Sequence, residues 1–184
     1  MNDAYFTADL HLGHEKLLGL GNGRPFQSIE EHDEAIIDNW NARVAKGDRV
    51  YLLGDFSFGS RSQTNEYISR LRGQIHVVLG NHDRVLDRHA HRFASIQSYK
   101  TLALEGQKLV LFHFPILSWE GVGRGSWHLH GHCHNNLPAE TVMARLDVGV
   151  DGHNFEPWNF EEIRQVLKDR DGLPGDHHGK KEKR

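Results

Sequence analysis

Residue types that bind metal ions recur in five segments of this chain, each just after an apolar run. The candidates are Asp9 and His11, Asp55, the group Asn81, His82 and Asp83, then His113, and finally His132 and His134. Carboxylates, imidazoles and amide oxygens are ligands for divalent metals such as Mn, Fe, Zn or Ni. The set is too large for one tetrahedral ion and about large enough for two ions that share a carboxylate. The sequence therefore predicts a binuclear metal centre.

The densest of these segments is HLHGHCHN, residues 128–135, in which four histidines alternate with other residues. Side chains two positions apart on an extended segment point the same way, so the four imidazoles could share one face. Cys133 should point away from them and is not counted as a ligand. Glycine stands before Asp55, Asn81 and His132, where it lets the backbone turn sharply beside a metal.

The elements that must position these residues follow from the apolar pattern. Strands are expected over residues 5–8, 49–53, 74–79, 99–104, 108–112, 127–130 and 141–148. Helices are expected from a capping box at 28–31 to residue 46, over about 63–71 and over 160–168, with a polar helix or turn over 84–92. This order predicts a mixed α/β protein with parallel and antiparallel pairing. Ligands bind at the carboxyl ends of strands in such sheets, which is where the five segments begin.

Bulk properties favour one ordinary globular domain. The chain has 184 residues, of which 38% are hydrophobic and 26% are charged. Its formal net charge of −3 gives no broad basic field for a nucleic-acid polymer. We find no membrane span and no secretory signal, and the single cysteine excludes an internal disulfide, so we expect a cytoplasmic protein. Residues 171–184 are charged and nearly free of apolar residues, which predicts a disordered tail.

The ordered pattern D-x-H, GD, GNHD, H and GHxH resembles that of the calcineurin-like metallophosphoesterase superfamily, from Tyr5 to about Val150. The resemblance implies a four-layer α/β/β/α sandwich with two mixed β-sheets, formed by a domain over residues 1–170. It also implies the ligand sets. The first metal would be held by Asp9, His11, Asp55 and His134, and the second by Asp55, Asn81, His113 and His132.

The resemblance further implies a mechanism for phosphoester hydrolysis. Two divalent ions, manganese first and iron, zinc or nickel as alternatives, would be bridged by Asp55, and a metal-bound hydroxide would attack phosphorus in line. His82 would stabilise the transition state and protonate the leaving oxygen, while Asp83 would orient His82.

The substrate is less constrained by the sequence. Arg24 and Arg124 lie in long loops and are the candidate phosphate contacts, and Trp119 could stack on an aromatic leaving group. We favour a phosphodiesterase acting on a small or nucleotide-like substrate. The alternatives are a phosphomonoesterase or protein phosphatase, and a nuclease on short single strands. A non-enzymatic scaffold is disfavoured because His82 and every ligand are present. Trp119, Trp127 and Trp158, if exposed, would allow a dimer.

Overall fold

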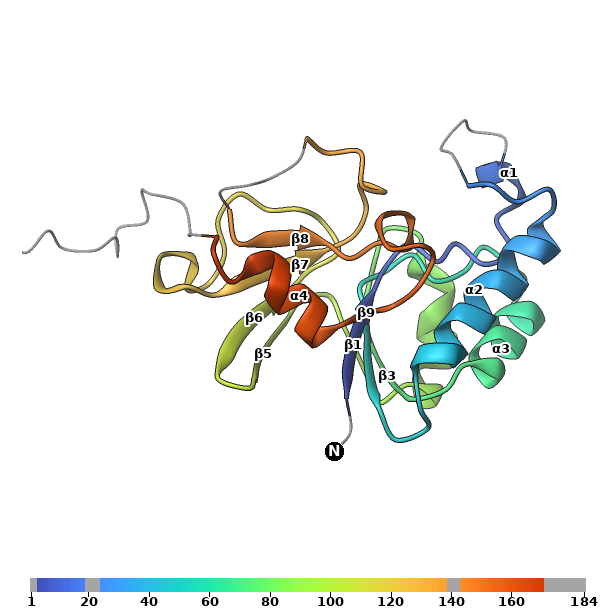
Figure 1. Cartoon of the computed structure of the whole chain (residues 1–184). Coiled ribbons are helices and arrows are strands. Elements are labelled where there is room, and N and C mark those ends of the chain that lie inside the picture. The colour runs from blue at the N-terminus through green and yellow to red at the C-terminus, as the bar shows by residue number, and fades with distance from the viewer. Residues whose placement is uncertain (1–2, 19–23, 139–142, 171–184) are drawn as a thin grey trace, which may run out of the picture.

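The strands of the protein form two sheets that lie against each other (Figure 1). The computed structural model describes residues 3–18, 24–138 and 143–170. The five-stranded sheet has the order β4 (Ser95–Gln97), β3 (Gln74–Val78), β2 (Arg49–Leu52), β1 (Ala4–Thr7) and β9 (Trp158–Asn159). The four-stranded sheet has the order β5 (Lys100–Leu104), β6 (Gln107–Leu111), β7 (Trp127–His130) and β8 (Arg145–Asp147).

Both sheets are mixed. Strands β1 to β4 are parallel to one another, and β9 pairs antiparallel with β1. In the second sheet, β5 and β6 form an antiparallel hairpin, while β6, β7 and β8 are parallel. The helices within the described ranges are α1 (Glu15–Leu18), α2 (Ile29–Arg43), α3 (Arg61–Arg70) and α4 (Phe160–Leu167). The predicted fold class, α/β with two mixed sheets, is confirmed.

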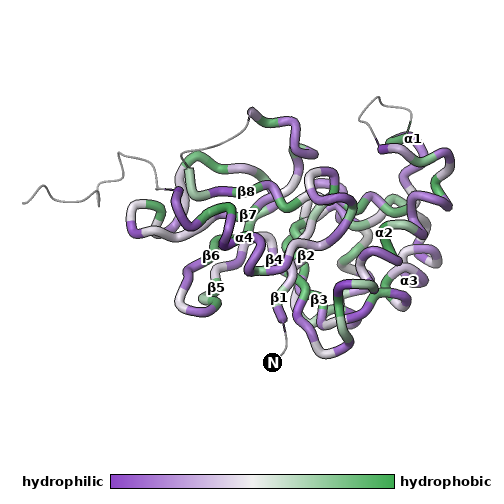
Figure 2. The backbone as a smooth tube through the Cα atoms, viewed as in Figure 1, coloured by the Kyte–Doolittle hydropathy of each residue, from purple (hydrophilic) through white to green (hydrophobic). Residues whose placement is uncertain are grey.

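Helices α2 and α3 lie side by side on the outer face of the five-stranded sheet (Figure 1). Ile36 and Trp40 of α2 are buried in the same apolar cluster as Val50 of β2 and Val77 of β3. Figure 2 shows hydrophobic residues, in green, where α2 and these strands meet. The helical spacing of the apolar residues in α2 is what places them on one face, against the sheet.

A second apolar cluster fills the space between the two sheets. Phe6 and Leu53 enter it from the first sheet, and Leu111 and Leu129 from the second. Helix α4 closes this core at one side through Ile163, which is fully buried. On the outer face of the second sheet, Trp119 and Val122 pack with Val110. The segment 114–126, which contains the 3₁₀ helix η2 (Val122–Arg124), therefore covers this part of the outer face.

The predicted helix starts are confirmed by their caps. The Ser28 hydroxyl accepts a hydrogen bond from Glu31 N at 3.1 Å, and Asn159 forms a capping box with Glu162 at the start of α4. A further capping box of Ser60 and Gln63 starts α3 at Arg61, slightly earlier than predicted. Residues 84–92, expected to be a helix or turn, belong to the 3₁₀ helix η1 (Asp83–Arg92).

Some expectations need correction. The strand predicted over 141–148 is the shorter β8, and residues 139–142 lie outside the described residues. Trp119 and Trp127 are only 6% and 7% exposed, so they cannot form the dimer surface we considered. The predicted disordered tail, 171–184, also lies outside the described residues. Among the residues that the structure describes, no helix has the length and apolar character needed to cross a bilayer.

Candidate metal centre

The loops after β1, β2, β3, β6 and β7 meet at the carboxyl ends of the strands of both sheets. Asp9 N donates to Gly54 O at 3.0 Å, which joins the loops after β1 and β2. Gly131 N donates to His113 O at 2.9 Å, which joins the loops after β7 and β6. His132 N donates to Asp9 Oδ2 at 2.8 Å, across the gap between the sheets. The parallel pairing therefore brings together segments that are far apart in the chain.

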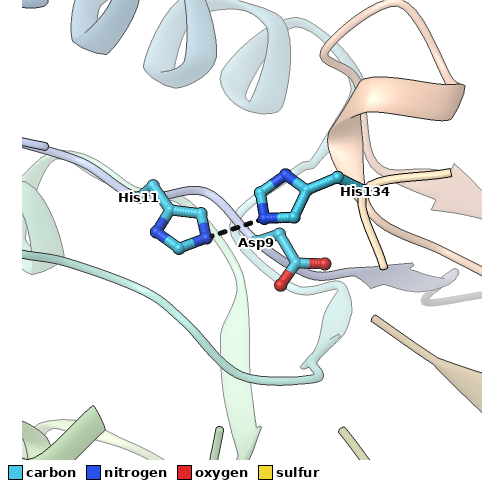
Figure 3. A group of neighbouring side chains, drawn as sticks. All are labelled: Asp9, His11 and His134. Carbon is cyan, nitrogen blue, oxygen red and sulfur yellow. Dashed lines mark hydrogen bonds between the residues drawn. The ribbon is translucent and has the colours of Figure 1, made fainter. Parts of the chain in front are cut away.

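Two overlapping groups of donor atoms result. Asp9, His11 and His134 form the first, with ligand atoms within 4.8 Å of one another (Figure 3). Figure 3 shows the two imidazoles facing each other, with His11 Nε2 3.2 Å from His134 Nε2. Asp9, Asp55 and His113 form the second group, within the same limit.

The remaining predicted ligands lie against this second group. Asn81 Oδ1 is 2.9 Å from His113 Nε2 and 3.1 Å from His132 Nδ1. Asp55 Oδ2 lies between the two groups, 3.8 Å from His11 Nε2 and 3.5 Å from His113 Nε2. The structure thus brings all seven predicted ligands together.

The donor set fits divalent cations. His113 Nδ1 faces Leu53 O at 2.7 Å, and His134 Nδ1 faces Asp151 Oδ2 at 2.8 Å. These contacts assign the ring protons to Nδ1 and turn the Nε2 lone pairs toward the site. Asp9 Oδ1 is buried and has no hydrogen-bond partner in the described part of the chain. A buried carboxylate oxygen that faces imidazole lone pairs is stabilised by a bound cation.

Burial also shifts the protonation of the ligands. Burial, and then the carboxylates of Asp147 and Asp55, raise the pKa of Asp9 well above its usual range. Burial, followed by the neighbouring His134, lowers the pKa of His11 to about 2. The His11 imidazole is therefore neutral at pH 7, the form that can bind a metal. A divalent cation would supply the positive charge that keeps Asp9 ionised.

The backbone at the site is held in an uncommon conformation. Five predicted ligands have a positive φ between 48° and 71°; they are Asp9, His11, Asp55, His132 and His134. Non-glycine residues rarely adopt this left-handed region, and each such residue costs on the order of 1–3 kcal/mol. Strain of this kind is concentrated at functional sites, where the surrounding fold fixes the position of the ligands.

Glycines before the ligands let the loops approach one another, as the sequence suggested. Gly54 has φ +89°, and a Cβ there would lie 2.5 Å from His113 Nδ1. A Cβ at Gly80 would lie 2.3 Å from Asp55 Oδ1. Both positions exclude any side chain, because real Cβ contacts are never this short.

His82 and Asp83 occupy different environments. The His82 side chain is exposed, and its ring centroid lies 4.7 Å from that of Phe58 and 6.0 Å from that of His11. The His82 backbone N donates to Asp55 Oδ1 at 3.0 Å, which holds it beside the centre. Asp83 is buried and accepts hydrogen bonds from three backbone N–H groups, those of Asp55, Phe56 and Gly80.

The orienting role expected for Asp83 is therefore corrected. Both Asp83 carboxylate oxygens are engaged by backbone N–H groups, so Asp83 ties the GNHD loop to the Asp55 loop instead of holding the His82 ring. Burial raises the pKa of Asp83, although the backbone hydrogen bonds oppose that shift. Asp83 positions His82 only through the backbone that follows Gly80.

Sequence reasoning missed the carboxylate that orients His134. Asp151 accepts from His134 Nδ1 through Oδ2, and from Arg24 Nε and Nη2, each at 2.8 Å. Although burial acts in the opposite direction, the hydrogen bonds from His134 and Arg24 hold the pKa of Asp151 below its usual range. Asp151 lies in the 3₁₀ helix η3 (Val150–Gly152), shortly after β8, much as the predicted ligands follow their strands.

Arg24 is the cationic partner of Asp151, and its predicted contact with substrate is wrong. Its side chain is 0% exposed. Besides binding Asp151, Nη1 donates to Leu10 O at 3.0 Å and Nη2 to Asp9 O at 2.7 Å. Arg24 therefore fixes both the first ligand loop and the carboxylate behind His134, which makes it a positioning residue.

Arg124 lies near the start of β6. It is exposed in η2, next to Gly125, whose carbonyl accepts from Gln107 Nε2 at 2.7 Å. Gln107 begins β6, whereas His113 follows the other end of that strand. Arg124 therefore lies towards the opposite end of β6 from His113, and its contact with substrate stays a prediction.

The upstream histidines of HLHGHCHN belong to the core. His128 Nδ1 faces Val110 O at 3.1 Å, and His130 Nδ1 faces Gly131 O at 2.9 Å. Burial lowers the pKa of each to about 4, so both are neutral at pH 7. His153 lies elsewhere, with its ring stacked on Trp158 at a centroid distance of 3.9 Å.

Replacing Asp151 with asparagine is expected to weaken metal binding by about 10- to 100-fold, because His134 loses the carboxylate that fixes its tautomer and orientation. Calorimetric titration of metal-stripped protein with Mn²⁺ measures this effect directly. Asp48→Asn is the control, since Asp48 is also buried but accepts only from backbone N–H groups, those of Asp3 and Ala45. Equal Mn²⁺ affinity in Asp151→Asn and Asp48→Asn would contradict the positioning role.

The fold and the clustered carboxylate, imidazole and amide groups form a candidate metal site, and sequence comparison identifies the family of the chain. The model of the calcineurin-like phosphoesterase superfamily domain matches residues 7–168. The chain belongs to this superfamily and is a metal-dependent phosphoester hydrolase.

Individual relatives are similar over most of their length. An uncharacterized protein of Methanocaldococcus jannaschii is 28% identical over 175 residues, covering 91% of this chain and 93% of that protein. The gene 66 protein of Mycobacterium phage L5 is 30% identical over 183 residues, covering 82% and 87%.

Solved structures share the fold. A protein of unknown function from Aquifex aeolicus has a TM-score of 0.72 at 21% identity, covering 91% of this chain and all of that one (100%). A novel archaeal phosphodiesterase has a TM-score of 0.51 at 18% identity, covering 80% and 82%.

Proposed function

We propose that the protein is a phosphodiesterase that holds two divalent metal ions and acts on a small or nucleotide-like substrate. Asp9, His11, Asp55 and His134 would hold one ion, and Asp55, Asn81, His113 and His132 the other. When bound, such ions stabilise charge on phosphoryl oxygens and lower the pKa of water towards neutrality. The observation that carries the proposal is the overlap of the two donor groups, with Asp55 Oδ2 within 3.8 Å of a histidine nitrogen from each.

The residues at the opening of the site supply the remaining functions. His82 and His132 are exposed, so a substrate can reach them while Asp9 and His113 stay buried beneath. We assign to His82 the transfer of a proton to the leaving oxygen, since its ring is accessible and its backbone is tied to Asp55. The apolar ring of Phe58 lies beside this imidazole, with ring centroids 4.7 Å apart.

A diester is favoured over a monoester by charge. A monoester carries an additional negative charge on its terminal oxygens, which cationic side chains usually bind. Of the two arginines that we expected to do so, Arg24 is buried in contacts with Asp151, and Arg124 lies towards the opposite end of β6 from His113. Manganese is our first choice of metal, because the donor set combines carboxylate, imidazole and amide oxygen. A phosphomonoesterase remains the alternative that the same centre could support.

The test is hydrolysis of bis(p-nitrophenyl) phosphate beside p-nitrophenyl phosphate, with metal-stripped protein and added Mn²⁺. We expect turnover to depend on Mn²⁺ and kcat/KM to be higher for the diester. A higher kcat/KM for the monoester would replace the proposal with a phosphatase. Metal binding without turnover of either ester would favour a scaffold on the same fold.

A further inference from the structure

A pocket with a cationic lining lies between the start of α3 and the 3₁₀ helix η1, which begins directly after His82. Its volume is 670 Å³, and it is lined by Ser60, Arg61, Ser62, Asn65, Arg88, His89 and His91. Among the described side chains that line it, the charged ones are arginines. Nothing in the proposed reaction at the metal ions uses these side chains, so the pocket needs its own explanation.

The charge of the pocket suits an anion. Arg61 and Arg88 are exposed, so their guanidinium groups are free to bind a ligand. Arg92 also lies at this face and donates to Asn65 Oδ1 at 2.6 Å. Burial, and then the charges of Arg61, His91 and Arg92, lower the pKa of His89, which reflects the positive field at this position.

Two further features point to a phosphate group. Helix α3 has ten residues, and Arg61 and Ser62, whose backbone N–H groups belong to its first turn, both line the pocket. His89 is only 3% exposed, and its Nε2 has no hydrogen-bond partner among the described residues. A buried ring nitrogen without a partner is costly, and a bound phosphate oxygen would provide one.

An exposed aromatic ring lies between this pocket and the metal centre. Phe58 is 37% exposed, stacks on His14 at a centroid distance of 3.8 Å and an interplanar angle of 12°, and contacts His82. The chain runs from Phe58 directly into the pocket at Ser60. His82 is the N-cap of η1, and Arg88 lies within this helix, about 12 Å further along at the 3₁₀ rise of about 2 Å per residue. The metal centre, the Phe58 ring and the pocket therefore form one continuous path, which we call the track.

We propose that the pocket binds a second phosphate of a short single-stranded oligonucleotide whose scissile phosphate lies at the metal centre. An intervening base stacks on Phe58, as bases do on aromatic side chains in proteins that bind single strands. This inference rests on the proposed phosphodiesterase function and names its substrate class. The small number of basic residues agrees with weak binding of a short strand rather than tight binding of a polymer.

The test compares two substrates, a short thymidine oligonucleotide and bis(p-nitrophenyl) phosphate, which has a single phosphate and cannot span the track. In the double variant Arg61→Gln/Arg88→Gln, the ratio of kcat/KM for the oligonucleotide to that for the small diester is expected to fall about tenfold or more. The slope of log(1/KM) against log salt for the oligonucleotide should decrease by about 1 to 2.

The matched control is Lys46→Gln/Lys168→Gln, which removes the same charge from exposed positions after α2 and α4. The control should keep the wild-type ratio. An unchanged ratio in the pocket variant, or an equal fall in the control, would overturn the inference.

Failure of the proposed function is recognised separately. If wild-type protein hydrolyses neither substrate, fluorescence anisotropy of a labelled thymidine oligonucleotide tests the pocket alone. Weaker binding by the pocket variant than by the control supports the site, and equal binding overturns it. Free inorganic phosphate is the other ligand that could supply a phosphate group to the pocket. If wild-type protein binds phosphate in the pocket while the variant leaves oligonucleotide binding unchanged, the assignment to an oligonucleotide is overturned.

Discussion

Asp55→Asn is expected to lose both metal ions together and to reduce turnover by more than about a hundredfold. Asp55 Oδ2 lies between His11 Nε2 and His113 Nε2, at 3.8 and 3.5 Å, so one carboxylate oxygen serves both donor groups. An amide has the same shape but no negative charge, and it can no longer neutralise two cations. Metal content per chain, measured by elemental analysis after Mn²⁺ loading and desalting, gives the result directly.

The control variant for Asp55→Asn is Asp38→Asn, which replaces an exposed carboxylate on α2. It should retain the metal content and the activity of the wild type. If Asp55→Asn retained one ion with full occupancy, Asp55 would belong to a single metal, and Asp9, which is common to both donor groups, would become the candidate bridge.

His82→Ala should retain its metal and lose about 10²- to 10⁴-fold in kcat on esters with poor leaving groups. His82 is exposed beside the centre and contacts Phe58, whereas the ligand atoms come from other residues. A good leaving group such as nitrophenolate departs without a proton, so the loss on nitrophenyl esters should be much smaller. Rates on alkyl and nitrophenyl diesters, measured at equal metal content, separate proton donation from metal binding.

His82→Gln completes this comparison, because glutamine can donate a hydrogen bond but cannot transfer a proton at neutral pH. A glutamine variant with wild-type rates on alkyl esters would show that His82 only binds the substrate. Equal losses on alkyl and nitrophenyl esters would point instead to stabilisation of the phosphoryl charge.

The ligand positions were predictable because each follows a strand. Apolar runs end at Asp9, Asp55, Asn81 and His113, and parallel strands bring their carboxyl ends to one edge. The identity of the ligands came from the ordered family pattern. The short strands β4 and β9 were missed, since segments of three and two residues carry no measurable alternation.

The contacts that position the ligands could not be predicted from spacing. Arg24 and Asp151 are separated by 127 positions, and no local pattern joins them. The guanidinium of Arg24 looked available for phosphate because it precedes a helix in a long loop, yet the fold buries it. Likewise, alternation predicted that four histidines share one face. In the structure, His128 and His130 lie in β7 and are buried, whereas the candidate ligands His132 and His134 follow the end of that strand.

The glycines beside the ligands have a consequence for how such an enzyme can diverge. At Gly54 and Gly80 the backbone of one loop lies directly against the next loop. A side chain added at either glycine would therefore displace a neighbouring residue of the site. The interior of the centre is therefore expected to change little during evolution. Variation that alters substrate preference should be confined to outward-facing side chains, such as Phe58 and Arg61, which can be replaced one at a time without moving any backbone.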